Sequence, residues 1–187
     1  MELPPQLPPN AKNVFSGILF DVYHWNQRMF DGSSTIFEII SRKSTVDIIA
    51  TKGSKIMILL QQQPGRPTYP SLPGGRIEED HSPLETAQRE LKEETGHGTK
   101  KWNLFMEFTG TSKLYFHEYL FLAKDCEVAG KACPDNGEKM EIEWKRFDEF
   151  LQYCREERFA APYGLKFLMY ECLLDSQKKE EFKRKIF

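Results

Sequence analysis

The sequence contains no apolar run approaching the ~20 residues of a membrane-spanning helix, and its first residues, MELPPQLPPN, are Pro-rich rather than basic and then apolar. It also lacks an excess of either charge, because 26 Lys and Arg residues face 28 Asp and Glu residues, a net charge of −2. Binding to a polyanion would need a local basic patch, and the most basic segment, KKEEFKRKIF, also carries acids. We expect neither a nucleic acid nor a membrane as a partner.

Cysteine and histidine are scarce, with four residues of each. The cysteines form no CxxC pair and no zinc-like pattern with the histidines: Cys126, Cys133, Cys154 and Cys172. This usage favours reduced thiols, and together with the lack of a basic and apolar leader it predicts a cytoplasmic protein.

The 187 residues divide into three predicted parts. Residues 1–12 are rich in proline and predict a flexible leader. In residues 13–44, β-branched and aromatic side chains alternate on both sides of the turn-like FDGSS, which predicts a small β-sheet subdomain. Residues 45–187 are predicted to form the main domain, which ends in helices.

Within the main domain, short apolar runs predict strands at 45–50, 55–63, 102–110, 113–123 and 140–147. The segment QPGRPTYPSLPGG is rich in Pro and Gly and predicts a long loop. Apolar residues recur at helical spacing in 147–159 and 163–185. A mixed sheet flanked by helices, and hence an α/β or α+β layer fold, is the expected architecture.

Residues 82–96 carry strong signals for a helix between that loop and the third strand. Ser82 and Glu85 predict a capping box, Pro83 suits the first helical position, and Gly96 suits a left-handed end. At about 100° per residue, Leu84, Ala87 and Leu91 share one flank.

The adjacent flank of this helix carries three carboxylates, on Glu90, Glu93 and Glu94. Like charges at this spacing repel, and Arg89 can offset only part of the repulsion. Acids on helices most often face water. The preceding Gly74 and Gly75, whose backbone can approach a metal or phosphate closely, favour a divalent cation instead.

The stretch from Gly75 to His97, GRIEEDHSPLETAQRELKEETGH, resembles the Nudix box, G-x5-E-x7-R-E-U-x-E-E-x-G-U with U apolar. Seven of the nine defined positions agree. His81 stands in place of the first Glu, and His97 replaces the last apolar residue. Because the first Glu is thought to support the box from the side, His81 is expected to weaken its organisation more than its chemistry.

The resemblance implies a Nudix αβα sandwich with a small N-terminal β-sheet subdomain, and a hydrolase of a nucleoside diphosphate linked to another moiety. It implies two or more Mg²⁺ ions, with Mn²⁺ as an alternative. Glu90, Glu94 and the Gly74 carbonyl would be ligands. Glu93 would be a ligand or act through a water, and Arg89 would orient Glu90.

A general base for the attacking water is expected on a loop well beyond the box, within CPDNGEKMEIEW. This acidic segment is similar to the one that enters a late strand in ADP-ribose pyrophosphatases. Glu138 is the first candidate and Glu141 the second, and an exposed acid at a strand edge is the alternative for each.

Residues 14–144 are similar in pattern to the ADP-ribose pyrophosphatase branch, which favours ADP-ribose, hydrolysed to AMP and ribose 5-phosphate. That branch places a phosphate-binding Arg where this chain has Gln63, and Arg66 is the candidate replacement. Lys113 follows a segment, FTGTS, that lacks the Pro and Glu of the branch. Nucleotide sugars, dinucleoside polyphosphates and a non-catalytic nucleotide-binding sensor remain alternatives.

The resemblance also implies a homodimer in which the N-terminal sheet of one chain helps to build the site of the other. Trp25, Arg28 and Phe30 could contact a nucleotide there, or lie at the surface or in the dimer interface.

Overall fold

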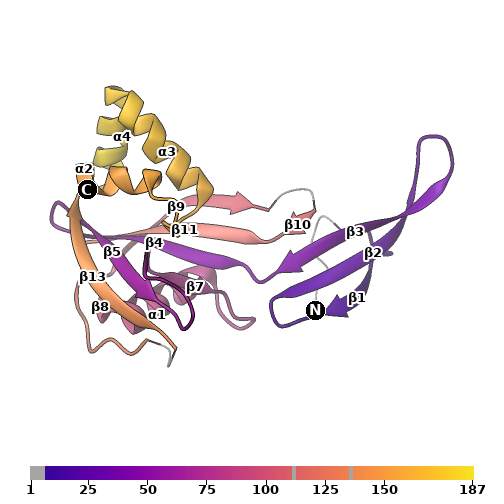
Figure 1. Ribbon diagram of the computed structural model, residues 1–187, viewed down its shortest axis with the longest axis horizontal. Helices are drawn as coiled ribbons and strands as arrows, with labels where there is room; N and C mark the ends of the chain where they lie inside the picture. The colour runs from indigo at the N-terminus through magenta and orange to yellow at the C-terminus, as the bar shows by residue number, and fades with distance from the viewer. Residues whose placement is uncertain (1–6, 111–112, 135–136) are drawn as a thin grey trace.

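The computed structural model describes residues 7–110, 113–134 and 137–187, and comprises two main sheets with helices on both faces of the larger one (Figure 1). Half of the predicted leader, residues 1–6, lies outside the described residues, as do Thr111 and Ser112 and two residues of the predicted base loop, Asp135 and Asn136.

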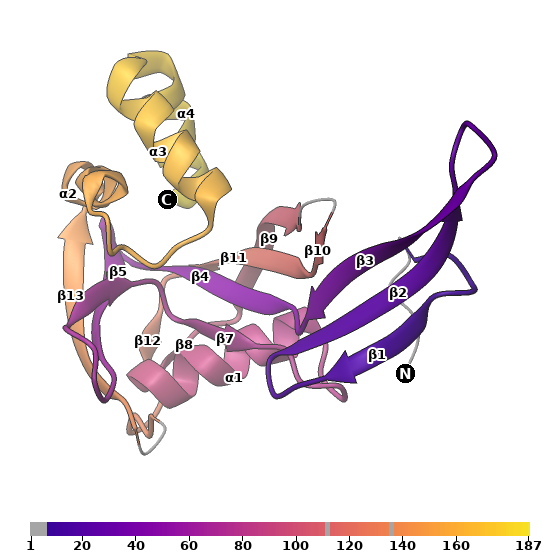
Figure 2. The same cartoon turned by 45° about the vertical axis from the view of Figure 1, so that its right-hand side comes forward.

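The first sheet has the strand order β1-β2-β3-β10 and projects from the main body (Figures 1 and 2). Its long hairpin turns at Gly32, whose φ of 85° suits glycine. A turn in which the Gly17 amide donates to the Phe20 carbonyl separates the first two strands of the sheet. The strands are β1 (Lys12–Ser16), β2 (Phe20–Arg28), β3 (Ser34–Arg42) and β10 (Leu114–Tyr115).

The larger sheet has the order β13-β5-β4-β11-β9, with β6 paired to β5 and β7 to β4. Both β4 and β5 are buried on both faces along most of their length, as is typical of strands with continuous apolar runs. The strands are β4 (Thr45–Lys52), β5 (Lys55–Gln62), β6 (Tyr69–Ser71), β7 (Gly74–Arg76), β9 (Lys101–Thr109), β11 (His117–Lys124) and β13 (Lys139–Arg146). A short pair, β8 (His97–Gly98) with β12 (Glu127–Val128), follows the helix of the box.

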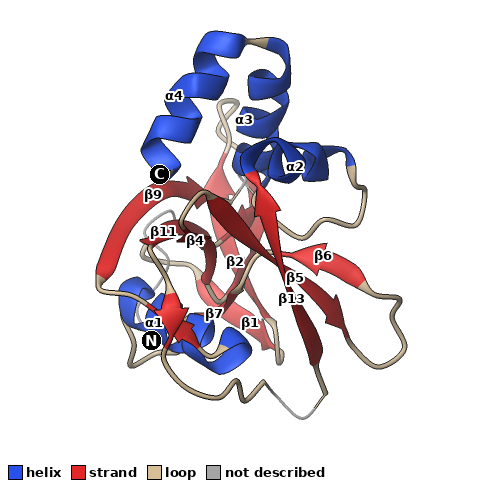
Figure 3. Ribbon diagram, turned by 90° about the vertical axis from the view of Figure 1, so that its left-hand side faces the viewer, coloured by secondary structure: helices blue, strands red, loops and turns tan. Residues whose placement is uncertain are grey.

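Helices cover both faces of this sheet (Figure 3). Helix α1 (Pro83–Thr95) packs against one face through Ala87 and Leu91, which meet Ile48, Met57 and other apolar residues. On the other face lie α2 (Phe147–Gln152), a 3-10 turn (Tyr153–Arg155), α3 (Tyr163–Leu174) and α4 (Ser176–Ile186). The layers confirm the predicted α/β fold. No helix among the described residues is both long and apolar enough to cross a bilayer.

The ends of α1 agree with the sequence prediction. Ser82 is the N-cap, its hydroxyl accepts from the Glu85 amide, and the Glu85 side chain accepts from the Ser82 amide. Gly96 ends the helix with φ of 69°. The predicted apolar flank is buried at Ala87 and Leu91, whereas Leu84 in the first turn stays 38 % exposed.

Two predicted segments are divided differently in the structure. The predicted loop at 63–75 contains β6 and the start of β7, because the edges of β5 and β4 offer backbone partners even to a Pro-rich chain. The predicted helix at 163–185 breaks at Asp175, whose side chain accepts from the amides of Gln177 and Lys178 and so begins α4.

Candidate active site

A cavity of about 690 Å³ opens where β4 and β5 separate. The two strands pair next to their connecting turn, and farther along β7 lies against β4 and β6 against β5. Helix α1 brings its acidic flank to this opening. Six residues that the sequence analysis selected line the cavity: Gly74, Gly75, Arg89, Glu90, Glu94 and Glu138.

Glu94 is the most buried of these carboxylates, with 8 % of its surface exposed. It accepts a hydrogen bond of 2.9 Å from the Gly74 amide. Burial raises the pKa of Glu94 to about 9, and the negative charges of Glu90, Glu138 and Asp47 contribute to the rise. An excess of buried negative charge therefore surrounds this side chain, and a bound cation would relieve it.

Arg89 connects the other two carboxylates of the helix. Its guanidinium donates to Glu90 and to Glu93, each at 2.6 Å. Glu90 faces the cavity, whereas Glu93 is largely exposed and does not contribute to the lining. The structure thus brings Glu90 and Glu94 together in the cavity and leaves Glu93 at its margin, joined through Arg89.

The two glycines before the helix are required by close approach rather than by an unusual φ. A Cβ at Gly74 would lie 2.2 Å from the Val46 carbonyl oxygen, because β7 is pressed against β4. A Cβ at Gly75 would lie 2.3 Å from Oε1 of Glu90. Only glycine therefore allows β7 to lie this close to β4 at Gly74, and the Glu90 carboxylate to lie this close to the backbone at Gly75.

Glu138 enters the cavity from the segment before β13. Its Oε1 accepts from the side-chain amides of Gln63, at 3.0 Å, and Gln61, at 3.5 Å. Glu141, the second candidate base, is exposed within β13 and does not line the cavity. Gln63 stands where the resembling branch has an arginine, and here it contacts the candidate base.

The remaining candidates lie apart from this cavity. Arg66 lines a smaller pocket that shares only Gln63 with it among the described residues. Trp25 and Arg28 are in β2 of the first sheet, where the Trp25 ring packs edge-on against Phe37 at 5.7 Å between centroids. His81, in contrast, lines the cavity, and His97 is buried against Trp144, filling the apolar position of the box.

Several further polar residues of the cavity were not predicted from the sequence, among them Asp47, Ser71 and Glu118. Burial raises the pKa of Asp47 to about 8; Glu118 adds to the rise and Arg42 opposes it. An acid in the middle of the apolar run TVDIIA was the available signal, because a central strand seldom carries an acid without a specific reason.

The donor set of the cavity suits hard divalent cations. Its described lining carries more carboxylates than guanidinium groups, so a pyrophosphate would need accompanying cations to enter. In the described ranges, no three Asp, Glu, His or Cys side chains are already grouped as a ligand set. Glu90 is held by Arg89 and Glu94 by Gly74, so each would have to turn toward a cation.

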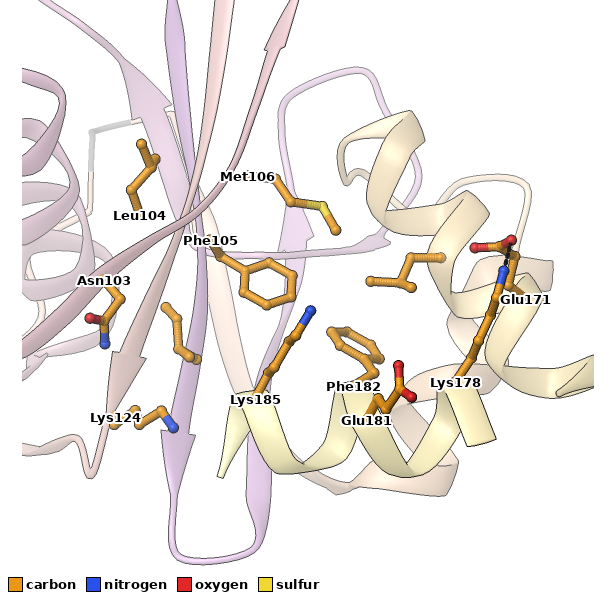
Figure 4. A pocket seen from close by; sticks show the side chains of 12 residues that line it. Asn103, Leu104, Phe105, Met106, Lys124, Glu171, Lys178, Glu181, Phe182 and Lys185 are labelled. Carbon is orange, nitrogen blue, oxygen red and sulfur yellow. Dashed lines mark hydrogen bonds and ion pairs between the residues drawn. The ribbon is translucent and has the colours of Figure 1, made fainter. Parts of the chain in front are cut away.

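A second cavity, of about 500 Å³, lies between β9 and the helices α3 and α4 (Figure 4). Phe105, Phe182 and Lys185 point into it, and Glu171 pairs with Lys178 at its rim. Its lining is mostly apolar, and its second carboxylate, Glu181, accepts a hydrogen bond from the side-chain amide of Gln177. The chemistry that the sequence predicts therefore belongs to the first cavity.

Comparisons with known proteins identify the family of this chain. The NUDIX domain family model matches residues 41–164. An ADP-ribose pyrophosphatase of Bacillus subtilis (strain 168) is 27 % identical over 182 residues, which cover 89 % of this chain and 94 % of the relative. A methanol dehydrogenase activator of Bacillus methanolicus is 27 % identical over 153 residues, covering 79 % and 82 %.

Among solved structures, an ADP compounds hydrolase superposes with a TM-score of 0.71 over 90 % of this chain and 94 % of that one, at 16 % identity. At this identity the likeness shows the fold alone. Because the family model covers well over half of the chain, and because the predicted box lies within the matched segment, this protein belongs to the Nudix domain family.

Proposed function

We propose that the protein is a Mg²⁺-dependent Nudix pyrophosphatase that hydrolyses ADP-ribose to AMP and ribose 5-phosphate. The observation that carries the proposal is the meeting of Glu90, Glu94 and Glu138 in one cavity beside Gly74 and Gly75. The similarity to an ADP-ribose pyrophosphatase over most of the chain supports the choice of substrate. A cytoplasmic location stays a prediction.

When bound, divalent cations would cover the charge of the pyrophosphate and acidify a water. Glu90, Glu94 and the Gly74 carbonyl would hold them, and Arg89 would keep Glu90 in position. Glu138 would accept a proton from the attacking water, whose oxygen bonds to phosphorus as the bond to the bridging oxygen breaks. The departing phosphate keeps the bridging oxygen.

A substrate panel tests the proposal. The protein is incubated with ADP-ribose, nucleotide sugars and dinucleoside polyphosphates, with and without Mg²⁺, and the products are identified. Mg²⁺-dependent release of AMP from ADP-ribose is the expected result. Tight binding of ADP-ribose without any product would show a nucleotide sensor instead, and hydrolysis confined to another compound would replace the substrate.

Gln63 provides a test of the base. Its amide holds one oxygen of Glu138 and so leaves the other free to face the water. Gln63→Leu is expected to lower kcat by about tenfold and to change KM by less than about twofold. Steady-state kinetics with ADP-ribose measures both. Gln62→Leu, at the exposed neighbouring position, is the matched control, and an unchanged kcat in Gln63→Leu would remove this role.

We also propose that residues 13–44 form a dimerisation subdomain and residues 45–187 the catalytic domain. The first sheet exposes apolar side chains that a second copy could cover, among them Phe15 and Ile36, 58 % and 65 % exposed. Trp25 and Arg28 on that sheet would then reach the partner's cavity. Light scattering is expected to give twice the chain mass, and Ile36→Asp a single chain mass. A monomeric wild type would contradict this proposal.

A further inference from the structure

The second cavity, between β9 and the helices α3 and α4, has the size of a ligand-binding site. Its volume of about 500 Å³ lies within the range of about 300–1,000 Å³ that is usual for pockets that bind small molecules. Among the described parts of the chain, it shares no lining residue with the first cavity. A ligand of this cavity would therefore be separate from the substrate of the proposed function.

The floor of the second cavity is apolar and is formed by residues that pack in the main core. Leu122 in β11 and Phe182 in α4 are buried, with 3 % and 2 % of their surfaces exposed. The Phe105 ring lies against Phe182, with 5.7 Å between the ring centroids. Met106 and Leu168 pack against the same cluster. The part of a ligand that touches this floor must be apolar, because a polar group would lose its water there.

The two carboxylates at the rim of the cavity already have partners within the chain. Glu171 pairs with Lys178 where α3 and α4 face each other. Glu181 accepts a hydrogen bond of 3.0 Å from the side-chain amide of Gln177. Since each acid already has a donor, the rim offers little to a cationic ligand.

Two lysines at the rim, Lys124 and Lys185, differ from the acids in this respect. Within residues 7–110, 113–134 and 137–187, neither ammonium group makes a hydrogen bond or an ion pair. Lys185 points from α4 into the cavity (Figure 4). Because three lysines and two carboxylates line the cavity, the charge that complements its rim is negative.

We propose that this cavity binds an amphipathic anion, the carboxylate of a medium-chain fatty acid. The carboxylate pairs with Lys185, and Lys124 adds to the attraction. The acyl chain lies along the floor beside Phe105 and Phe182. These two rings are 5.7 Å apart at an angle of 36°, too close for a flat ring to stack between them, which needs about 7 Å. An unbranched chain can follow the surface that they form.

Calorimetric titration of the whole chain with sodium decanoate tests the proposal. We expect saturable binding of one decanoate per chain. Octanoate should bind about tenfold more weakly, because each buried methylene group strengthens binding about fourfold. Decyltrimethylammonium joins the same acyl length to a cationic head, and it should bind at least about tenfold more weakly than decanoate because the unpaired lysines repel it.

Two variants test the head and the acyl chain separately. Lys185→Gln is expected to raise the Kd for decanoate about fourfold, the usual size for an ion pair near the surface. Lys183→Gln, at an exposed position of α4 outside the cavity, is the matched control and should leave the Kd unchanged. Met106→Trp would fill the cavity and should raise the Kd at least about tenfold, and thermal unfolding shows whether this variant is folded.

The absence of saturable binding would overturn the proposal, as would a Kd for decyltrimethylammonium equal to that for decanoate. Equal Kd values for the wild type and Lys185→Gln would also overturn it, because the carboxylate would then not pair with this lysine. Light scattering measures the mass of each variant. A mass that falls in Met106→Trp would show that a second copy of the chain covers the cavity, and the proposal would fail.

Discussion

Glu94→Gln is expected to lower kcat by on the order of 10²–10⁴-fold, because a metal ion contributes several kcal/mol to the transition state and a neutral amide holds it poorly. Glu94 is the most buried carboxylate of the cavity, and Glu90, Glu138 and Asp47 surround it with negative charge. A cation among these groups would be attracted more strongly by Glu94 than by an exposed carboxylate, because solvent screens the charge of a buried group less.

The same substitution should leave the protein folded. The glutamine side-chain oxygen can accept the hydrogen bond that the Gly74 amide now donates to Glu94, at 2.9 Å. The amide also replaces a buried carboxyl group whose pKa burial raises to about 9, so the thermal midpoint without metal should not fall below that of the wild type. Steady-state kinetics, calorimetric titration with Mg²⁺ and thermal unfolding measure the three effects. Glu127→Gln, on the exposed strand β12, is the control.

Near-normal turnover in Glu94→Gln would remove the metal assignment. If turnover were lost but the affinity for Mg²⁺ were unchanged, Glu94 would act in catalysis without being a metal ligand. Lost turnover together with a lower thermal midpoint would show that the carboxylate stabilises the fold, and the comparison with Glu127→Gln separates this from a general effect of removing one charge.

The features of α1 could be predicted because they depend on residues close in sequence. Ser82, Glu85 and Gly96 set the two ends of the helix through contacts within one turn, and the helical period separates Leu91 from Glu94. Short apolar runs in the local sequence also predicted most of the strands of the larger sheet. The local sequence did not predict β6 and β7, which form in the segment predicted to be a loop.

The placement of Asp47, Glu118 and Glu138 in the cavity depends on strand pairings that no local pattern contains. Asp47 and Glu118 come to the same face of the sheet because β11 pairs parallel to β4 in one particular register, across more than sixty intervening residues. In this register Leu120 lies opposite Asp47. Glu138 rather than Glu141 enters the cavity because β13 runs antiparallel to β5, which places Lys139 opposite Gln62. A shift of one residue in either pairing would turn these side chains to the other face.

Gly75→Ala is expected to lower kcat by on the order of 10- to 100-fold while the protein stays folded. The added methyl group would lie 2.3 Å from Oε1 and 2.4 Å from Cδ of Glu90. These atoms are the end of a flexible side chain, so the carboxylate can swing away at small cost to stability. Glu90 would then leave both Arg89 and the cavity, and misplaced supporting contacts of a metal site typically cost this much.

Gly74→Ala is expected to act on the fold rather than on the Glu90 side chain. Its methyl group would meet the Val46 carbonyl oxygen at 2.2 Å and the Asp47 Cα at 3.1 Å, both backbone atoms that cannot rotate away. Strand β7 would have to leave β4, so we expect a loss of about 3 kcal/mol in the free energy of unfolding, together with lost activity.

Gly130→Ala is the matched control for both glycine variants, because the nearest atom to its new methyl group would be Lys92 Cε at 3.9 Å. Chemical denaturation gives the free energies and steady-state kinetics gives kcat. If Gly75→Ala kept full activity, Glu90 would not need its present position, and the metal site would have to be built from Glu94 and Glu138 alone. If Gly75→Ala unfolded as readily as Gly74→Ala, its lost activity would say nothing about Glu90. We expect Gly75→Ala to lose activity without stability, and Gly74→Ala to lose stability. This result would show that Gly74 is needed for the pairing of β7 with β4, and Gly75 for the position of the Glu90 carboxylate.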